Sequence, residues 1–529
     1  IDLESNQFTK IPASTLLGYS DQVWPASLDR IVATARAEEI PFWISVPRKE
    51  VSARGKGKPA PVVIFGHGLA GNRVTTLALA GLFAQHGLAV LSFDFPSHGM
   101  GLGKVEVAAI KVVAEPYGLS PFLGAMLEDR ALDQNGDGRP DSGADFMTAY
   151  AFHTRDMMRQ STLDTMQMIR LLRSFDGKRR SKFDVDGDGA RELAGDFDGD
   201  GEVDVGGSAE VLMAGGSLGG IMTLMVSGLE PEITTAVALA GGAGLGDIGV
   251  RTRHGAVLET LVLRLLSPLY VGTLDAKSGR MKLSTIVTDL DDPSRHEIDT
   301  VDGVKIGDTV VVENLANGER GCGHVSQAGK LRLAVESDAG DRTRILFYRG
   351  SLALGEQCAL AGAAPYATVD EFKVKSYFQD QTVETGSDLR ALAEGMGLPR
   401  NSPRLRRFLY FAMMALDAGD PVSYVRHITR DPLVYPDGSQ TGASLLSVAT
   451  IGDMVVPTST AITAGRAAGL IDYTRPDPRY GVPRNQVLLD SYVAEAVHKI
   501  PRYTHPQTGK GVHKDVDDFS DGKDTWGDD

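Results

Sequence analysis

The sequence predicts an α/β fold, in which a mostly parallel β-sheet is covered by helices. Two observations lead to this prediction. Short apolar runs of strand length alternate along the chain with helical stretches, which is the pattern of a parallel sheet buried on both faces. Turn-forming residues, above all glycine, bound these runs, as expected where strands end in loops.

The expected elements follow the chain in order. The strand-like runs lie at 40–46, 61–65, 88–93, 209–214, 234–240 and 444–450. Helical patterns lie at 77–86, 155–175, 256–274, 389–397 and 403–416. In the second of these, Met158, Met166, Ile169 and Leu172 fall on one face, which we interpret as core packing. The apolar helices at 256–274 and 403–416 fit either a lid over an acyl pocket or ordinary helical cover.

We expect three segments along the chain. Residues 1–277 form the N-terminal part of the α/β core and carry Asp-rich loops at 133–141 and 184–204. Residues 278–360 form an inserted β-rich module, because alternating runs are separated there by Gly, Asp and Asn turns. Residues 361–529 supply helical cover and the C-terminal part of the core.

Composition excludes some classes of function. The formal net charge is -15, which argues against a nucleic-acid partner, since phosphate binding needs clustered Lys and Arg. No run of about 18 apolar residues occurs that could span a membrane. The two cysteines, Cys322 and Cys358, are compatible with one disulfide or with two free thiols. The chain begins at Ile1 without a signal-peptide pattern, so export is an inference from other features.

A G-x-S-x-G motif identifies the candidate nucleophile. The run Gly215-Gly216-Ser217-Leu218-Gly219 lies between an expected strand and an expected helix, which is the context that this motif requires. Small flanking residues permit a tight turn that exposes the hydroxyl, and the helix start directs N–H groups toward it. We therefore predict that Ser217 is the nucleophile; the alternative is a glycine-rich turn with an idle serine.

Two further loops complete the expected site. His67-Gly68-Leu69 ends an earlier strand, and we expect the N–H groups of Leu69 and Leu218 to form the oxyanion hole. His67 itself is interpreted as an anchor of that loop. Asp453, after the last expected strand, is the candidate triad acid, with a helix cap ahead of Thr458 as the alternative.

The catalytic base is the least defined member of the triad. Downstream of Asp453 the histidines are His498, His505 and His513. His498 is the first choice, because it follows an apolar run that could be a final strand, and His505 is the second. The alternative is a base on a C-terminal segment that is absent from this chain.

These motifs resemble those of the α/β-hydrolase superfamily, specifically its lipase and esterase branch and large secreted bacterial lipase-like proteins with calcium-binding Asp-rich loops. The resemblance rests on residues 63–69, 94–99, 215–220 and 452–457, and on the chain order Ser, Asp, His. It implies hydrolysis of carboxylic esters through an acyl-enzyme. The β-rich insertion and the absence of a Gly-His-Gly near the C-terminus depart from the pattern.

Three acidic loops share one design, in which oxygen-bearing side chains alternate and glycine permits a sharp turn, as in calcium-binding loops. None has the Glu at the twelfth position of an EF-hand. Solvated acidic turns are the alternative, and we otherwise expect structural Ca²⁺. The expected ligands are Asp133, Asn135, Asp137, Asp141, Asp184, Asp186, Asp188, Asp196, Asp198, Asp200 and Asp204.

Together these features predict a secreted or cell-surface serine esterase or lipase. Its substrate would be a small-molecule or lipid ester, with possible peripheral contact with lipid. One alternative is another acyl hydrolase that cleaves amides, peptides or polyesters. The other is a calcium-dependent binding protein on a hydrolase scaffold.

Overall fold

The fold falls into two compact units in the computed structural model. Among the described residues, the larger unit runs from 39 to His254 and resumes at Met413, and the smaller unit spans 255–412. The structure describes residues 39–118, 120–133, 138–148, 150–181, 184, 189–252, 254, 257, 264–266, 268–287, 294–355, 358–360, 362–378, 381–392, 395–398, 403–450, 452–490, 501–504 and 511–513.

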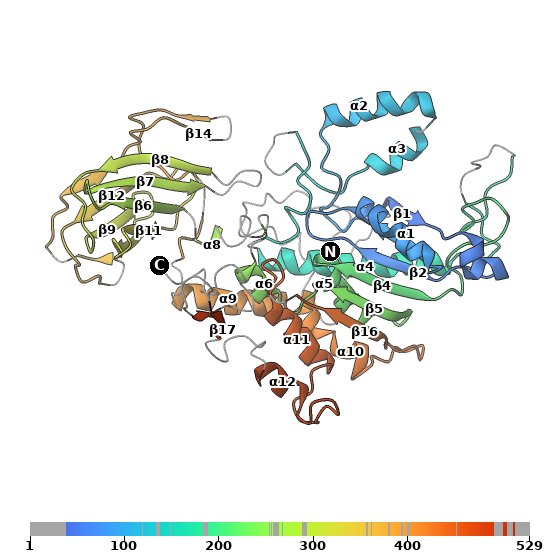
Figure 1. Cartoon of the computed structure of the whole chain (residues 1–529). Helices are drawn as coiled ribbons and strands as arrows, with labels where there is room; N and C mark the ends of the chain where they lie inside the picture. Colours follow the sequence, from blue (N-terminus) through green and yellow to red (C-terminus); the bar gives the residue numbers. More distant parts are fainter. Residues whose placement is uncertain are drawn as a thin grey trace. The chain divides into compact units, whose positions relative to one another are not determined.

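The larger unit is built on a six-stranded sheet of order β1-β3-β2-β4-β5-β16 (Figure 1). β1 is antiparallel to β3, and all other neighbours are parallel. All six expected strands are confirmed. The strands are β1 (Phe42–Ser45), β2 (Val62–Gly66), β3 (Ala89–Phe93), β4 (Val211–Gly216), β5 (Ile233–Leu239) and β16 (Ser444–Val448).

Helices surround this sheet. The α-helices of this unit are α1 (Leu77–Gln85), α2 (Lys104–Ala114), α3 (Ser120–Leu127), α4 (Ala151–Arg173), α5 (Leu218–Ser227), α6 (Leu245–Arg251), α10 (Arg426–Thr429), α11 (Thr458–Ala468) and α12 (Arg484–Asp490). α9 (Pro403–Leu416) begins in the smaller unit, and its residues from Met413 belong to the larger one. Short 3₁₀ turns are η3 (Lys49–Val51), η4 (Ala53–Lys56), η5 (Arg73–Thr76), η6 (Glu115–Tyr117), η9 (Asp417–Gly419) and η10 (Pro421–Ser423). None of the described helices is long and apolar enough to cross a bilayer.

The core of the larger unit has two layers. Leu79 and Phe83 of α1 pack with a cluster that includes Val237 of β5. Leu224 of α5 packs with the next residue of that strand, Ala238, together with residues of α10 and α11. Because successive strand residues point to opposite faces, the two clusters cover opposite faces of the sheet. All ten residues of α5 are buried, so this helix is the most enclosed element beside the expected nucleophile.

The smaller unit consists of antiparallel strands. Its two four-stranded sheets have the orders β10-β9-β12-β13 and β11-β6-β7-β8, and β14 pairs with β15. The strands are β6 (Leu269–Asp275), β7 (Arg280–Val287), β8 (Ser294–Val301), β9 (Thr309–Asn314), β10 (Arg320–His324), β11 (Lys330–Ala334), β12 (Thr343–Tyr348), β13 (Ala367–Val369), β14 (Ser376–Phe378) and β15 (Gln381–Val383). A shared apolar core includes Tyr270, Leu283 and Phe347. A disulfide joins Cys322 of β10 to Cys358. Of the two possibilities that the sequence allowed, one disulfide or two free thiols, the structure therefore has the disulfide.

The helix expected at 389–397 is wrong, and the one expected at 256–274 is wrong from Leu269 onward, whereas the described residues Val257 and Arg264–Leu266 before it are helical. Of the described residues in 256–274, only the short α8 (Arg264–Leu266) is a multi-residue helix, and Leu269 onward is strand β6, paired with β7 and β11. At 389–397 the described residues form isolated bridges to 342 and 337 instead of a helix. Leu389 and Ala391 are both buried and lie two residues apart. This is the spacing of residues on one face of an extended segment, so the apolar residues here follow the period of a strand and not that of a helix. The expected helix at 403–416 is confirmed as α9.

The expected core stripe is largely confirmed, since Met158, Ile169 and Leu172 of α4 are fully buried. Met166 is half-buried. The smaller unit is longer at both ends than the module expected at 278–360, because β6 and the extended residues up to 398 belong to it.

The disulfide should stabilise the smaller unit. It closes a loop with a sequence separation of 36, for which the loss of chain entropy in the unfolded state corresponds to about 4 kcal/mol. We expect Cys322→Ser/Cys358→Ser to lower the melting temperature of that unit, as measured by calorimetry. Reductant should have the same effect on the wild type and none on the double variant. Identical melting of oxidised and reduced wild type would contradict this prediction.

Candidate active site

Ser217 sits in a strained turn between a strand and a helix. β4 ends at Gly216 and α5 begins at Leu218. The backbone of Ser217 has φ 55 and ψ -119, a region that non-glycine residues rarely adopt and that concentrates at functional sites. Its N–H donates to Leu239 O at 2.9 Å, so the neighbouring strand holds the strained conformation. The residue is half-buried.

Three glycines make this turn possible. A Cβ on Gly219 would lie 1.9 Å from Gly66 O, and a Cβ on Gly215 would lie 2.4 Å from the backbone of Gly219. A side chain at either position would collide with main-chain atoms that cannot move aside. The first turn of α5 is therefore pressed directly against the ends of β2 and β4, and the motif glycines are required by that contact.

The loop after β2 passes beside the serine. A Cβ on Gly68 would lie 3.7 Å from Ser217 Cβ. A turn follows, in which Gly71 N–H donates to Gly68 O at 2.9 Å. Leu218 is the first residue of α5, where amide groups have no partner within the helix. The structure thus brings the loop that contains Leu69 and the helix start at Leu218 together at the candidate nucleophile, as an oxyanion hole requires.

His67 anchors the same loop. Its Nε2 accepts the N–H of Phe95 at 3.0 Å, and its Nδ1 lies 2.9 Å from Gly68 O. A neutral ring with the proton on Nδ1 satisfies both contacts. Burial lowers the pKa of His67 to about 4, so the neutral form persists at physiological pH. Both nitrogens are occupied, which confirms the interpretation of His67 as an anchor.

A buried ion pair fixes the far side of this loop, and the sequence did not reveal it. Arg73 pairs with Asp94, which follows β3, and the guanidinium also donates to Met126 O at 2.7 Å and Glu128 O at 2.9 Å. Burial raises the pKa of Asp94 to about 6, and Arg73 opposes this rise. The pair ties the loops after β2 and β3 together.

Asp453 lies beyond the end of β16 and is half-buried. Its Oδ1 accepts the N–H groups of Val455 at 2.8 Å and Val456 at 3.0 Å. Asp453 therefore shapes the turn that follows it, but it does not cap α11, whose N-cap residue is Pro457. Because both bonds use Oδ1, this role does not exclude contact between Oδ2 and an imidazole.

The catalytic base stays a prediction. His498 and His505 lie outside the described residues, and His513 ends β18 (Gly511–His513), which pairs with β17 (Pro501–Thr504). Among the described side chains, no histidine is hydrogen-bonded to Ser217. The candidate nucleophile and the oxyanion loop are thus both formed by residues before 240, and the base is the member of the site that the described residues do not supply.

The acidic loops share a hydrogen bond as well as a sequence pattern. In each loop the first aspartate accepts, through Oδ2, the N–H of the glycine five residues later, which has a φ of 85 to 91. The pairs are Asp133 with Gly138 at 2.8 Å, Asp184 with Gly189 at 3.0 Å and Asp196 with Gly201 at 2.8 Å. The remaining expected ligands Asn135, Asp137, Asp186 and Asp188 lie outside the described residues, and Asp141 N–H donates to Leu132 O.

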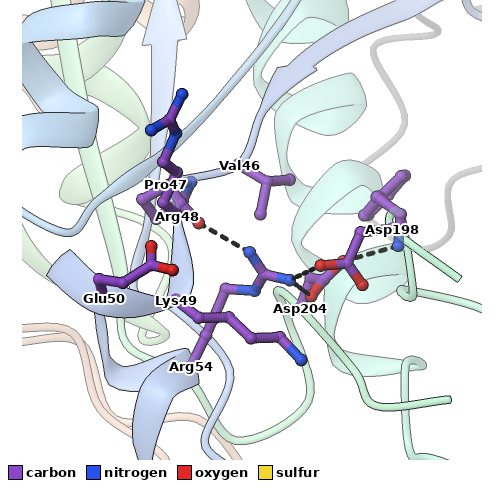
Figure 2. A pocket seen from close by; sticks show the side chains of 9 residues that line it. Val46, Pro47, Arg48, Lys49, Glu50, Arg54, Asp198 and Asp204 are labelled. Atoms are coloured by element: carbon purple, nitrogen blue, oxygen red, sulfur yellow. Dashed lines mark hydrogen bonds and ion pairs between the residues drawn. The ribbon is translucent and has the colours of Figure 1, made fainter. Parts of the chain in front are cut away.

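The third loop brings three carboxylates together. Ligand atoms of Asp196, Asp198 and Asp204 lie within 4.8 Å of one another. Arg54, which the sequence did not single out, is buried against Asp198 and Asp204 and also donates to Pro47 O at 2.8 Å. Arg54, Asp198 and Asp204 line a pocket of about 470 Å³ (Figure 2). Asp200, another expected ligand, pairs instead with Lys49.

Comparison with known proteins gives only partial likenesses. No protein-family model and no curated protein matches the sequence. One similar structure is a 2,6-dihydroxy-pseudo-oxynicotine hydrolase, with 15% identity over 42% of this chain and 38% of that one and a TM-score of 0.22. Another is the acetyl xylan esterase from Paenibacillus sp. R4, with 17% identity over 40% and 47% and a TM-score of 0.21. The alignments cover less than half of either protein, and likenesses this weak carry no argument about function.

The arrangement of the chain itself decides the fold. A strained serine turn joins a parallel strand to a buried helix, and a glycine turn after the neighbouring strand lies beside it. The larger unit is an α/β fold with a mostly parallel sheet, and the serine turn lies at the end of its strand β4. In this unit, the residues that position the loops but were given no role from the sequence are Arg73, Asp94 and Arg54. Their partners are far away along the chain, so no local motif marks them.

We expect the stabilising contribution of His67 to decrease as the pH falls. Because burial lowers the pKa of His67 from about 6.5 to about 4, the unfolded chain binds a proton in this window before the folded protein does. The loss approaches about 3 kcal/mol over the whole window. Unfolding free energies of the wild type and His67→Gln should therefore converge between pH 7 and pH 4. Parallel curves for the wild type and His67→Gln over this pH range would contradict the prediction.

Proposed function

We propose that this chain is a serine hydrolase that cleaves carboxylic esters through an acyl-enzyme. The observation that carries the proposal is the backbone of Ser217, held at a positive φ between β4 and α5 with the Gly68 loop beside it. This conformation costs about 1–3 kcal/mol, and strain of this kind concentrates at active sites. The local geometry presents a hydroxyl and backbone N–H donors at one point.

The proposed reaction has two halves. Ser217 Oγ attacks the ester carbonyl carbon while a histidine, with His498 as first choice, takes its proton. The N–H groups of Leu69 and Leu218 bind the oxyanion of the tetrahedral intermediate. The alcohol leaves with the proton from the histidine, and water then attacks the acyl group on Ser217 in the same way. Asp453 would orient the histidine and stabilise its charged form.

The substrate class is a small-molecule or lipid ester. A panel of p-nitrophenyl esters of increasing acyl length separates a lipase from a short-chain esterase, and amide, peptide and polyester substrates test the other acyl hydrolases. The choice of esters over these alternatives rests on the resemblance of the motifs to the lipase and esterase branch.

Removal of the Ser217 hydroxyl should abolish hydrolysis. We expect Ser217→Ala to lower kcat by several orders of magnitude, up to about 10⁶-fold, with unchanged circular dichroism. A fluorophosphonate should label the wild type and not this variant. Ser208 is exposed and precedes β4, so Ser208→Ala is the matched control and should behave as the wild type.

Retained activity in Ser217→Ala would overturn the assignment of the nucleophile. An inert wild type that is not labelled would favour the alternative of a calcium-dependent binding protein on a hydrolase scaffold, for which the acidic loops are the supporting observation.

We also propose that the third acidic loop holds a structural Ca²⁺. The donor set is suitable, since carboxylates at alternate positions converge and calcium takes six to eight oxygen ligands. Asp204 Oδ1 is buried and has no hydrogen-bond partner, although Arg54 pairs with it ionically. Arg54 thus neutralises part of the cluster, and a cation would share these carboxylates with it. No step of the reaction needs the ion.

Calcium should therefore stabilise the fold more than it affects chemistry. At about 100 times its Kd, an ion that binds only the folded state contributes about 2.7 kcal/mol. We expect a chelator to lower the melting temperature and Ca²⁺ to restore it. Asp196→Asn should weaken this response, while the exposed Asp437→Asn, remote from the loop in sequence, should not. Equal melting with and without chelator would count against the site.

The site of action that fits these features is outside the cell or at its surface. The Cys322–Cys358 disulfide is typical of oxidising compartments. Loops without the bidentate twelfth-position Glu bind calcium weakly, which suits millimolar extracellular concentrations. Peripheral contact with lipid would be consistent with a lipid ester as substrate.

A further inference from the structure

We propose that Ser142 and Gly143, here called the brace, hold the oxyanion loop at 68–71 in its working position, so that Ser142 is a positioning residue for catalysis. The proposal rests on the proposed esterase function. The brace lies in the chain between the first acidic loop and α4, in a segment that contains no recognised motif. The proposal is based on the contacts that these two residues make.

The Ser142 hydroxyl connects two loops at the end of the sheet. It donates to Gly71 O at 3.1 Å and accepts the N–H of Gly99 at 3.1 Å. Gly71 belongs to the loop after β2, and Gly99 belongs to the loop after β3. One side chain therefore satisfies a carbonyl of the oxyanion loop and fixes its distance from the neighbouring loop.

The backbone of Gly143 also contacts both loops. Its N–H donates to Ser97 O at 2.7 Å, and its φ of 79 favours glycine. A Cβ at this position would lie 2.8 Å from Ala70 N and 2.8 Å from His98 Nε2. The main chain of Gly143 is thus seated against the oxyanion loop itself, at a residue, Ala70, that already has a strained φ of 60.

His98 forms the wall behind this contact. The ring is fully buried, its Nδ1 lies 2.9 Å from Pro96 O, and its centroid lies 4.8 Å from that of His67. Nδ1 therefore carries the proton, and the buried Nε2, which has no hydrogen-bond partner in the described structure, faces Gly143. The oxyanion loop is held by His67 on one side and by the brace and His98 on the other.

The position of this loop matters because an oxyanion donor must lie about 2.7–3.1 Å from the developing charge. Gly68 is beside Ser217, and the turn closed by Gly68 and Gly71 contains Leu69. Movement of Gly71 or Ala70 would displace the Leu69 N–H relative to Ser217. Because the oxyanion forms only in the transition state, the loss should appear in kcat and leave KM nearly unchanged.

The test compares Ser142→Ala, Ser142→Thr and Gly143→Ala with the wild type, using a soluble p-nitrophenyl ester. We expect Ser142→Ala to lower kcat about tenfold with KM within about twofold, and Ser142→Thr to recover most of the rate because it keeps the hydroxyl. Gly143→Ala should lose more. Hydrogen exchange of residues 68–71 should be faster in Ser142→Ala, a readout that does not depend on turnover.

Ser174 provides the matched control, because its hydroxyl also donates to a backbone carbonyl, Leu171 O, at 2.7 Å, but at the end of α4. Ser174→Ala should leave kcat unchanged. If Ser142→Ala lowers only the melting temperature, with kcat and exchange at 68–71 as in the wild type, the brace is overturned while the esterase proposal stands. An inactive wild type that no fluorophosphonate labels would overturn the esterase proposal and the brace with it.

Discussion

The contact between Gly219 of α5 and Gly66 of β2 is the constraint on which the rest of the site depends. No side chain fits between these two backbones, so the helix starts immediately above the sheet and the preceding residue must turn at a positive φ. That residue is Ser217. The same contact places Gly68, two residues beyond Gly66, beside the serine. The glycines therefore determine both the exposure of the hydroxyl and the position of the neighbouring loop.

Buried polar groups hold the glycine-containing loops after β2 and β3 in one conformation. Glycine-rich loops have much conformational freedom to lose, and here His67, Asp94 and Ser142 each bond to the backbone of loops that follow β2 or β3. A buried charge pair is costly unless its remaining donors are satisfied, and Arg73 meets this requirement through the carbonyls of Met126 in the last turn of α3 and of Glu128 just after it. These contacts therefore restrict the movement of both loops.

In the third acidic loop, positively charged side chains of the protein offset part of the negative charge, which the composition alone does not reveal. The net charge of -15 and the Asp-rich runs point to a cation, and the third loop does bring carboxylates together. Yet Arg54 and Lys49 come from the segment after β1 to pair with them. The loop is thus tied to the sheet by protein cations, and any bound calcium would add to an attachment that already exists.

The sequence by itself determined the features that depend on neighbouring residues: the six strands of the larger unit's sheet, the glycine turn at Ser217 and the repeated acidic loops. Tertiary structure decided the rest. Residues 269–275 and 389–397 carry apolar spacings that fit a helix or a strand, and only pairing with partners such as β7 selects the strand. Likewise Arg54, Arg73 and Ser142 act through contacts distant in sequence, and such contacts leave no local pattern because folding alone brings their partners together.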